Sequence, residues 1–177
     1  MKSEIFGLIG ALLGTILGWI LNTISRGGKL NIYVTSWKEN FTFNKRGVMS
    51  PSTSIEESSN YDYELEMDIY NSSSDTKIMR NIKIVFRNQK EVLFVSTPYD
   101  SSTKRFVARH FSLDELKTIN ISPKTVATIR LERNLWLEDS KNDLIWFANN
   151  ILLSYIDSKN KNKTIFVQKV DYRKYFE

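Results

Sequence analysis

The sequence predicts a mainly β protein, in which one N-terminal transmembrane helix precedes a single antiparallel β-sandwich domain. Three observations lead to this fold class. Residues 5–24 contain no charged side chain. After residue 29, short runs alternate between apolar and polar residues, which is the period of a strand with one buried face. Turn-forming residues separate these runs about every ten positions, as in sandwich folds.

The uncharged run is long enough to cross a bilayer. Twenty helical residues at about 1.5 Å each span about 30 Å, the thickness of the hydrocarbon core. A cleaved signal peptide has a shorter apolar region and a small-x-small cleavage site, whereas this run ends in NTISRGGK. A buried core helix is the other alternative, although it is not normally so long and uncharged. We expect residues 1–28 to form a retained transmembrane helix with a short basic linker, and residues 29–177 to form the sandwich.

Small residues form one stripe along this helix. At about 100° per residue, the four glycines lie within about 80° of one another, and the alanine extends them. In lipid, helices associate through close van der Waals contact, which small residues permit. Glycine is also common in transmembrane helices generally, but it would then scatter around the helix. We therefore predict helix–helix packing, and a homo-oligomer, through Gly7, Gly10, Ala11, Gly14 and Gly18.

Two polar residues, Thr15 and Asn22, extend the same stripe. If several helices assembled around a channel, these side chains would line it. A pore lined by Thr15 and Asn22 is thus a weaker hypothesis that depends on the helix packing.

Basic residues near the membrane predict the orientation. Lys2 precedes the helix together with Glu4, whereas Arg26 and Lys29 follow it. The positive-inside rule assigns the side with more Lys and Arg to the cytoplasm. We expect a single-pass protein of the cell membrane, or of an inner membrane, with a cytoplasmic C-terminal domain.

The clearest strand is YDYELEMDIY at residues 61–70. Its odd positions, 61–69, are apolar or aromatic and predict a buried face, whereas the even positions 62–68 are acidic and predict a solvated face. Arg80, Lys83 and Lys77 are expected to be the cross-strand partners of these acids, and a cation site is the alternative. Further strands are predicted at residues 30–37, 78–86, 91–98, 117–134, 151–157 and 163–170, with a short helix within 140–149. The Cys…Trp…Cys landmarks are missing, so "immunoglobulin-like" describes the predicted architecture alone.

Residues for known catalytic chemistry are scarce. His110 is the only histidine and cysteine is absent, so neither a His/Cys zinc cluster nor a Cys–His nucleophile can form. Gly-x-Ser-x-Gly and the phosphate-binding glycine motifs are also absent. Residues 112–115, SLDE, match a helix capping box. We expect no enzymatic activity, no catalytic residues, no metal and no cofactor.

Basic residues near the C-terminus offer a binding hypothesis. Tyr172, Tyr175 and Phe176 are interleaved with the basic tail. A basic patch with aromatics suits anionic lipid headgroups, a nucleotide signal or an oligonucleotide; the alternative is a solvated, lysine-rich turn. We expect the patch at one end of the sandwich, made by Lys159, Lys161, Lys163, Lys169, Arg173 and Lys174.

Several stretches carry a resemblance, namely residues 10–19, 26–30, 70–73, 79–84 and 120–124. They resemble a loose group of bacterial single-pass proteins in which a glycine-rich helix precedes a β-sandwich. The layout is also similar to small membrane effectors of anti-phage systems. That likeness implies a sandwich that senses a ligand or partner and helices that oligomerise to form a pore or disrupt the membrane. The alternative is a passive tether or scaffold that holds a partner protein at the membrane.

Overall fold

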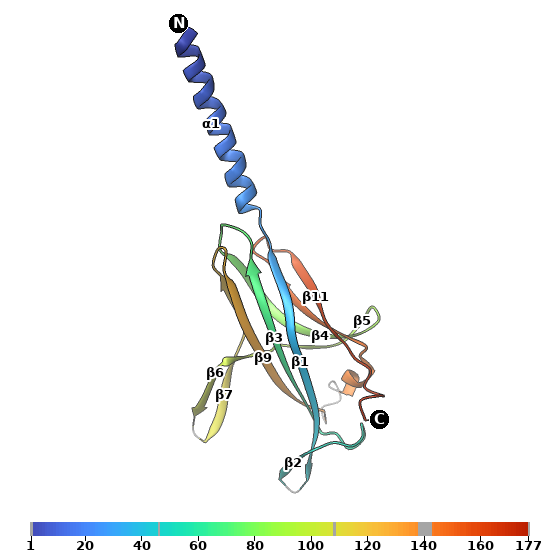
Figure 1. Ribbon diagram of the computed structural model, residues 1–177. Helices are drawn as coiled ribbons and strands as arrows, with labels where there is room; N and C mark the ends of the chain where they lie inside the picture. Colours follow the sequence, from blue (N-terminus) through green and yellow to red (C-terminus); the bar gives the residue numbers. More distant parts are fainter. Residues whose placement is uncertain (1, 46, 108, 138–142, 177) are drawn as a thin grey trace.

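A computed structural model of the chain describes residues 2–45, 47–107, 109–137 and 143–176. One long helix, α1, stands clear of a β-sandwich and points away from it (Figure 1). The C-terminus lies at the end of the sandwich that is remote from this helix (Figure 1). The elements are α1 (Lys2–Arg26), β1 (Leu30–Lys45), β2 (Val48–Pro51), β3 (Asn60–Asn71), β4 (Lys77–Asn88), β5 (Glu91–Ser96), β6 (Tyr99–Val107), β7 (His110–Glu115), β8 (Thr118–Ile121), β9 (Val126–Trp136), a 3-10 helix (Asp143–Phe147), β10 (Asn150–Ile156) and β11 (Asn162–Lys169).

The strands form two antiparallel sheets. One has the order β2-β1-β3-β9-β6-β7, and the other has the order β11-β10-β4-β5 with β8 pairing to β4. The longest ladder joins β1 to β3, from Leu30 opposite Asn71 to Thr42 opposite Asn60, with a shift in register after Val34. The predicted fold class, a mainly β chain with an antiparallel sandwich behind one N-terminal helix, is confirmed.

The core lies between the two sheets and contains the faces that alternation predicted. Five side chains of β3 point inward, each at most 1% exposed: Tyr61, Tyr63, Leu65, Met67 and Ile69. From the facing sheet, β4 contributes Ile82, Ile84 and Phe86, which are fully buried. Because the chain has no cysteine, apolar burial takes the place of the disulfide found in many immunoglobulin domains.

The SLDE segment is a strand, which corrects the capping-box interpretation. Residues 112–115 lie in β7, which pairs with β6 in a hairpin that projects sideways from the sandwich (Figure 1). The Arg105 guanidinium donates two hydrogen bonds to the Asp114 carboxylate, at 2.8 and 2.9 Å. The Asp114 amide donates to the Thr103 hydroxyl at 2.9 Å. Glu115, the residue whose carboxylate would close a capping box, instead lies 3.8 Å from the Arg133 guanidinium.

The partners predicted for the acidic face of β3 were also wrong. Lys77, Arg80 and Lys83 belong to β4, which lies in the opposite sheet, because the chain crosses between sheets after residue 71. β3 instead pairs with β1 and β9. β9 supplies the contacts: Arg130 to Glu66 at 3.0 Å, Asn134 to Asp62 at 2.6 Å and Thr128 to Asp68 at 2.6 Å. Within the described residues, no group of three or more His, Cys, Asp or Glu is arranged to hold a metal ion.

The short helix expected within residues 140–149 is present as the 3-10 helix Asp143–Phe147; residues 140–142 lie outside the described residues. Its Trp146 ring stacks on Phe41 with centroids 4.5 Å apart. The helix thereby covers the core at the end of the sandwich where the C-terminus lies.

Candidate functional site at the helix–sandwich junction

Helix α1 has the length and composition to cross a membrane. Its window Ile9–Arg26 is the one candidate span among the described helices, and the sandwich buries none of it. The Thr15 and Thr23 hydroxyls donate to the carbonyls of Ala11 and Trp19, at 2.9 and 2.8 Å. Threonine side chains are thus satisfied within the helix, as a lipid environment requires.

The glycine stripe of this helix is uncovered in the single chain. A Cβ atom added at Gly7, Gly10, Gly14 or Gly18 would meet no atom within 4 Å. The Ala11 and Asn22 side chains are exposed as well. The face predicted for helix packing is therefore sterically open to a second helix. The Thr15 hydroxyl proposed to line a pore is occupied by its bond to Ala11.

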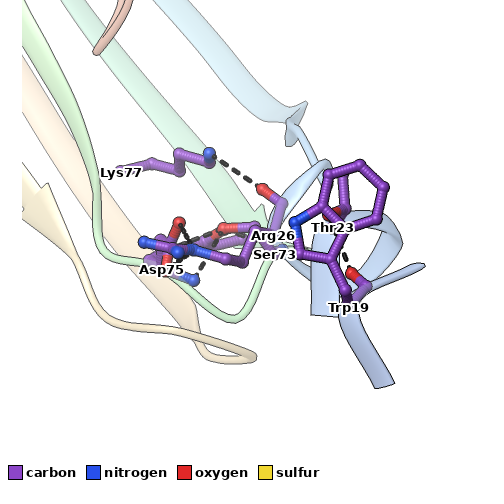
Figure 2. Close-up of polar contacts among 7 residues, drawn as sticks. Trp19, Thr23, Arg26, Ser73, Asp75 and Lys77 are labelled. Atoms are coloured by element: carbon purple, nitrogen blue, oxygen red, sulfur yellow. Dashed lines mark hydrogen bonds and ion pairs between the residues drawn. The ribbon is translucent and has the colours of Figure 1, made fainter. Parts of the chain in front are cut away.

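The last turn of α1 is bound to the β3–β4 turn, residues 72–76. The Arg26 guanidinium donates to both carboxylate oxygens of Asp75, at 3.0 and 3.2 Å. The Ser74 amide donates to the Ser25 carbonyl at 3.1 Å, and the Lys77 ammonium donates to the Arg26 carbonyl at 3.5 Å. Figure 2 shows the Lys77 ammonium directed at the Arg26 carbonyl, while the Arg26 side chain is directed at Asp75. Carbonyls that a helix end leaves unpaired thus receive partners from the sandwich.

The linker after the helix packs directly on the same turn. A Cβ at Gly28 would lie 2.5 Å from the backbone of Ser72 and Ser73, so only glycine fits there. The Lys29 amide donates to the Ser72 hydroxyl at 2.9 Å, and the Ser72 amide donates to the Lys29 carbonyl at 3.0 Å. The chain therefore passes from helix to sandwich without a free linker. We call this set of contacts, between residues 25–29 and 72–77, the junction.

The turn itself is held by buried polar side chains. Asn71 and Ser73 are both 0% exposed. The side-chain NH₂ group of Asn71 donates to the carbonyls of Asp75, Ile121 and Ser122 at 2.8–3.1 Å. The side-chain oxygen of Asn71 accepts from the backbone amide and the hydroxyl of Ser73. Because these groups are satisfied internally, the turn is a fixed support for the helix.

A hollow of about 450 Å³ lies beside the junction. It is lined by the linker, by the start of β4 and by the β10–β11 hairpin. Five of its lining residues are lysines, and we call it the basic groove: Lys29, Lys77, Lys159, Lys161 and Lys163.

Asp157 also lines the basic groove, and its carboxylate accepts hydrogen bonds within the β10–β11 hairpin. Its Oδ1 accepts the amides of Lys159 and Lys161, each at 2.9 Å. Desolvation acts to raise the pKa of Asp157, but these amides and the charges of Lys163 and Lys161 outweigh it and hold the pKa below its usual range. The carboxylate thus shapes the hairpin while the lysine side chains extend from it.

The predicted basic patch is divided between the two ends of the sandwich, which corrects the expectation of one cluster. Lys163 pairs with Tyr155 at one end of the β10–β11 ladder, and Lys169 pairs with Asn150 at the other. Lys169, Arg173 and Lys174 line a separate hollow beside Asn88. The reason is that β11 runs along the sandwich, so residues before and after it cannot meet.

The aromatic tail closes the far end of the sandwich. Tyr172 is 1% exposed, and its hydroxyl lies 3.0 Å from both the Tyr61 hydroxyl and a Glu39 carboxylate oxygen. The Tyr175 hydroxyl donates to the Glu39 carbonyl at 3.1 Å. Burial, with the nearby Glu39 charge, raises the pKa of Tyr172 well above its usual range. The Tyr172 ring therefore belongs to the core and is not available for stacking, whereas Tyr175 is partly exposed.

Sequence reasoning missed Lys77 as a groove residue and used Lys29 for orientation alone. Both are distant in sequence from the hairpin, and no local pattern connects them. The junction was missed because residues 71–77 were interpreted simply as a turn. Gly28 was the available clue, since a glycine pair after a helix can indicate a close approach of backbones.

The fold and the junction define a class: an immunoglobulin-like β-sandwich protein joined closely to one N-terminal helix that is long and apolar enough to span a membrane. A family model described as the YopI Ig-like domain matches residues 28–168. The chain therefore belongs to the YopI Ig-like domain family. The match begins at the junction residue Gly28, and α1 precedes it.

A curated relative matches along nearly its whole length. The SPbeta prophage-derived protein YopI of Bacillus subtilis is 26% identical over 168 residues, which cover 93% of this chain and 94% of the relative. The ApaA protein of Bordetella pertussis is 9% identical, with a TM-score of 0.37 over 81% of this chain and 91% of its own. A β-sandwich protein of Clostridium difficile is 13% identical, with a TM-score of 0.34 over 79% and 86%.

Proposed function

We propose that this protein is a membrane-anchored effector. Its helix α1 spans the membrane and self-associates through the glycine stripe, and its cytoplasmic sandwich controls that association when it binds a ligand or partner. The observation that carries the proposal is the junction. A change in the position of the sandwich moves the helix directly, because Gly28 and Lys29 are packed and bonded to the β3–β4 turn.

The same observation separates this function from a passive tether. A passive tether benefits from a flexible Gly/Ser-rich linker, which lets the domain find its partner over a range of distances from the membrane. Here the residues between helix and first strand, 27–29, are held by backbone contacts. A rigid connection is superfluous for tethering and necessary for transmitting motion, so the geometry favours the effector.

The basic groove supports the cytoplasmic orientation. Lys77 and the hairpin lysines, which are far apart in the sequence, lie with Lys29 at the end of the sandwich that α1 adjoins. The cytoplasmic leaflet carries a negative surface potential that attracts such residues. The prophage origin of the Bacillus subtilis relative adds support for a role in conflict between phages and their hosts, with a pore or a disrupted membrane as the outcome.

Dye release from liposomes tests the effector function. The full chain is reconstituted at increasing density, and leakage should rise more steeply than in proportion to density, because several helices must assemble. Gly14→Leu should flatten the curve, since the added side chain holds facing backbones apart, while the control Ile16→Leu on the opposite helix face should match the parent. Each contact is worth about 1–2 kcal/mol at best. A chain that never causes leakage, and crosslinks equally in all three forms, is a tether.

Cysteine labelling tests the orientation. The chain has no cysteine, so Lys90→Cys in the exposed β4–β5 turn introduces a single thiol. It should resist an impermeant thiol reagent in intact cells and react after lysis. Labelling in intact cells would place the sandwich outside.

A further inference from the structure

In the described part of the chain, the five lysines of the basic groove are not paired with carboxylates in ion pairs, whereas Arg26 beside them is paired with Asp75. Lys77 donates to the Arg26 carbonyl. Among the described lining residues Asp157 carries the opposing charge, which interacts with Lys161 and Lys163. Five lysines against this carboxylate leave an excess of positive charge, and an anion in the hollow would relieve the repulsion between the ammonium groups.

The groove sits where the apolar helix ends. The candidate span ends at Arg26, and the next residues, Gly27 and Gly28, already line the groove. Each headgroup layer adds about 5–7 Å to the hydrocarbon core, and the two linker residues after Arg26 reach at most about 7 Å beyond the helix end. If α1 spans the membrane, the groove therefore lies at the level of the lipid phosphates.

The lining of the groove suits a headgroup better than a nucleotide. Lysine ammonium groups bind phosphate as point charges, and Leu30 and Ile165 supply an apolar wall for the glycerol and the first methylenes. A nucleotide base would need an exposed aromatic face for stacking. The aromatic ring in the groove, Tyr155, is only 6% exposed.

From these observations we infer that the basic groove binds the phosphate of an anionic phospholipid in the leaflet where α1 ends. The inference rests on the membrane anchoring of the proposed function and adds the ligand class. Its occupant fixes the sandwich against the membrane surface, since the groove walls include both the linker and the β10–β11 hairpin.

Two charge-matched variants test the inference. Lys159→Gln/Lys161→Gln/Lys163→Gln removes three charges at the membrane end, and Lys169→Gln/Arg173→Gln/Lys174→Gln removes three at the far end. The hairpin keeps its shape in the first variant because Asp157 accepts backbone amides, which the substitutions retain. Equal thermal unfolding of both variants and the parent verifies the fold.

Native mass spectrometry of the full chain in detergent measures binding of phosphatidylglycerol and of phosphatidylcholine. The membrane-end variant should bind phosphatidylglycerol about a hundredfold more weakly than the parent, with phosphatidylcholine little changed. The far-end variant should equal the parent. An equal loss in both variants would reveal a net-charge effect, and no loss in the membrane-end variant would show that the groove is unused. Either result overturns the inference.

Soluble phosphate distinguishes the source of the anion. Glycerol 3-phosphate at millimolar concentration should leave phosphatidylglycerol bound to the parent. Displacement would mean that the groove takes a free phosphate, which overturns the lipid assignment. The dye-release and crosslinking experiments test the proposed function independently of lipid binding. A chain that binds phosphatidylglycerol in the groove but neither crosslinks nor causes leakage would contradict the effector function and leave the lipid inference standing.

Discussion

Gly28→Ala should break the junction while leaving the rest of the chain intact. Alanine can adopt the backbone conformation of Gly28, so the effect is steric. The added Cβ lies 2.5 Å from Ser72 and Ser73, whereas an ordinary contact begins at 3.4 Å. All three nearest atoms belong to the backbone, so no side-chain rotation relieves the clash and the turn must withdraw by about 0.9 Å.

The expected cost follows from what that movement disturbs. Overpacking of this kind costs about 1–3 kcal/mol. The withdrawal also lengthens the bonds between Lys29 and Ser72, which are 2.9 and 3.0 Å long, and each lost bond costs about 1 kcal/mol. We expect a loss of about 2–4 kcal/mol, which corresponds to a Tm about 4–16 °C lower for a chain of this length.

Near-UV circular dichroism of the full chain in detergent micelles measures this loss in the sandwich. Gly14→Ala is the matched control, since its Cβ meets nothing within 4 Å, and its Tm should equal that of the parent. Asp75→Asn should lie between the two, because the Arg26–Asp75 pair is exposed and such pairs contribute about 1 kcal/mol or less. An unchanged Tm for Gly28→Ala would refute the direct packing of linker on turn, and with it the rigid junction.

The remaining predictions concern the body of the sandwich. Tyr172→Phe should lower the free energy of unfolding in urea by about 1–2 kcal/mol, because its buried hydroxyl contacts Tyr61 and Glu39. Tyr175→Phe should cost less, since Tyr175 is 41% exposed. Asp62→Asn should raise the free energy of unfolding slightly at neutral pH, by no more than about 0.5 kcal/mol. Desolvation is the largest cause of the raised pKa of Asp62, against the opposing bond from Asn134. Since a raised carboxyl pKa destabilises the fold only while the group is ionised, the gain should vanish as the pH falls through the raised pKa and below the ordinary Asp value. A gain that persists in acid would contradict this origin.

Alternation predicted the core because burial in a sheet repeats every two residues. The strand at residues 61–70 shows this directly, as each of its five apolar positions is buried. The hairpin β6–β7 was not predicted because its strands project into solvent and do not alternate between buried apolar and exposed polar residues. Its Phe106 and Phe111 are 67% and 70% exposed. Pairing of β3 with β9 joins residues about 65 positions apart, and no local pattern contains that information.

The site was predictable only in part, for a related reason. The lysines of the β10–β11 turn could be read from the sequence, and their link to Lys77 and Lys29 could not. The tail was misplaced because a basic, aromatic sequence looks the same whether its rings are exposed or buried. The Tyr172 ring packs on Phe41 and Trp146, and its buried hydroxyl is tolerated because Glu39 and Tyr61 are its hydrogen-bond partners, an arrangement that only the fold creates.

Strand β1 gives the proposed coupling a physical route. Its start follows Lys29 at the junction, and Glu39 on the same strand accepts hydrogen bonds from Trp37, Tyr61 and Tyr172 at the far end. Ten residues of strand cover about 33 Å, and the ladder with β3 supports them from Leu30 to Thr42. A partner that displaced the C-terminal tail from Glu39 would therefore act on the same continuous element that carries Lys29 against Ser72. Motion along that strand reaches α1 without crossing a flexible segment, because the residues between them are those that the β3–β4 turn holds in place.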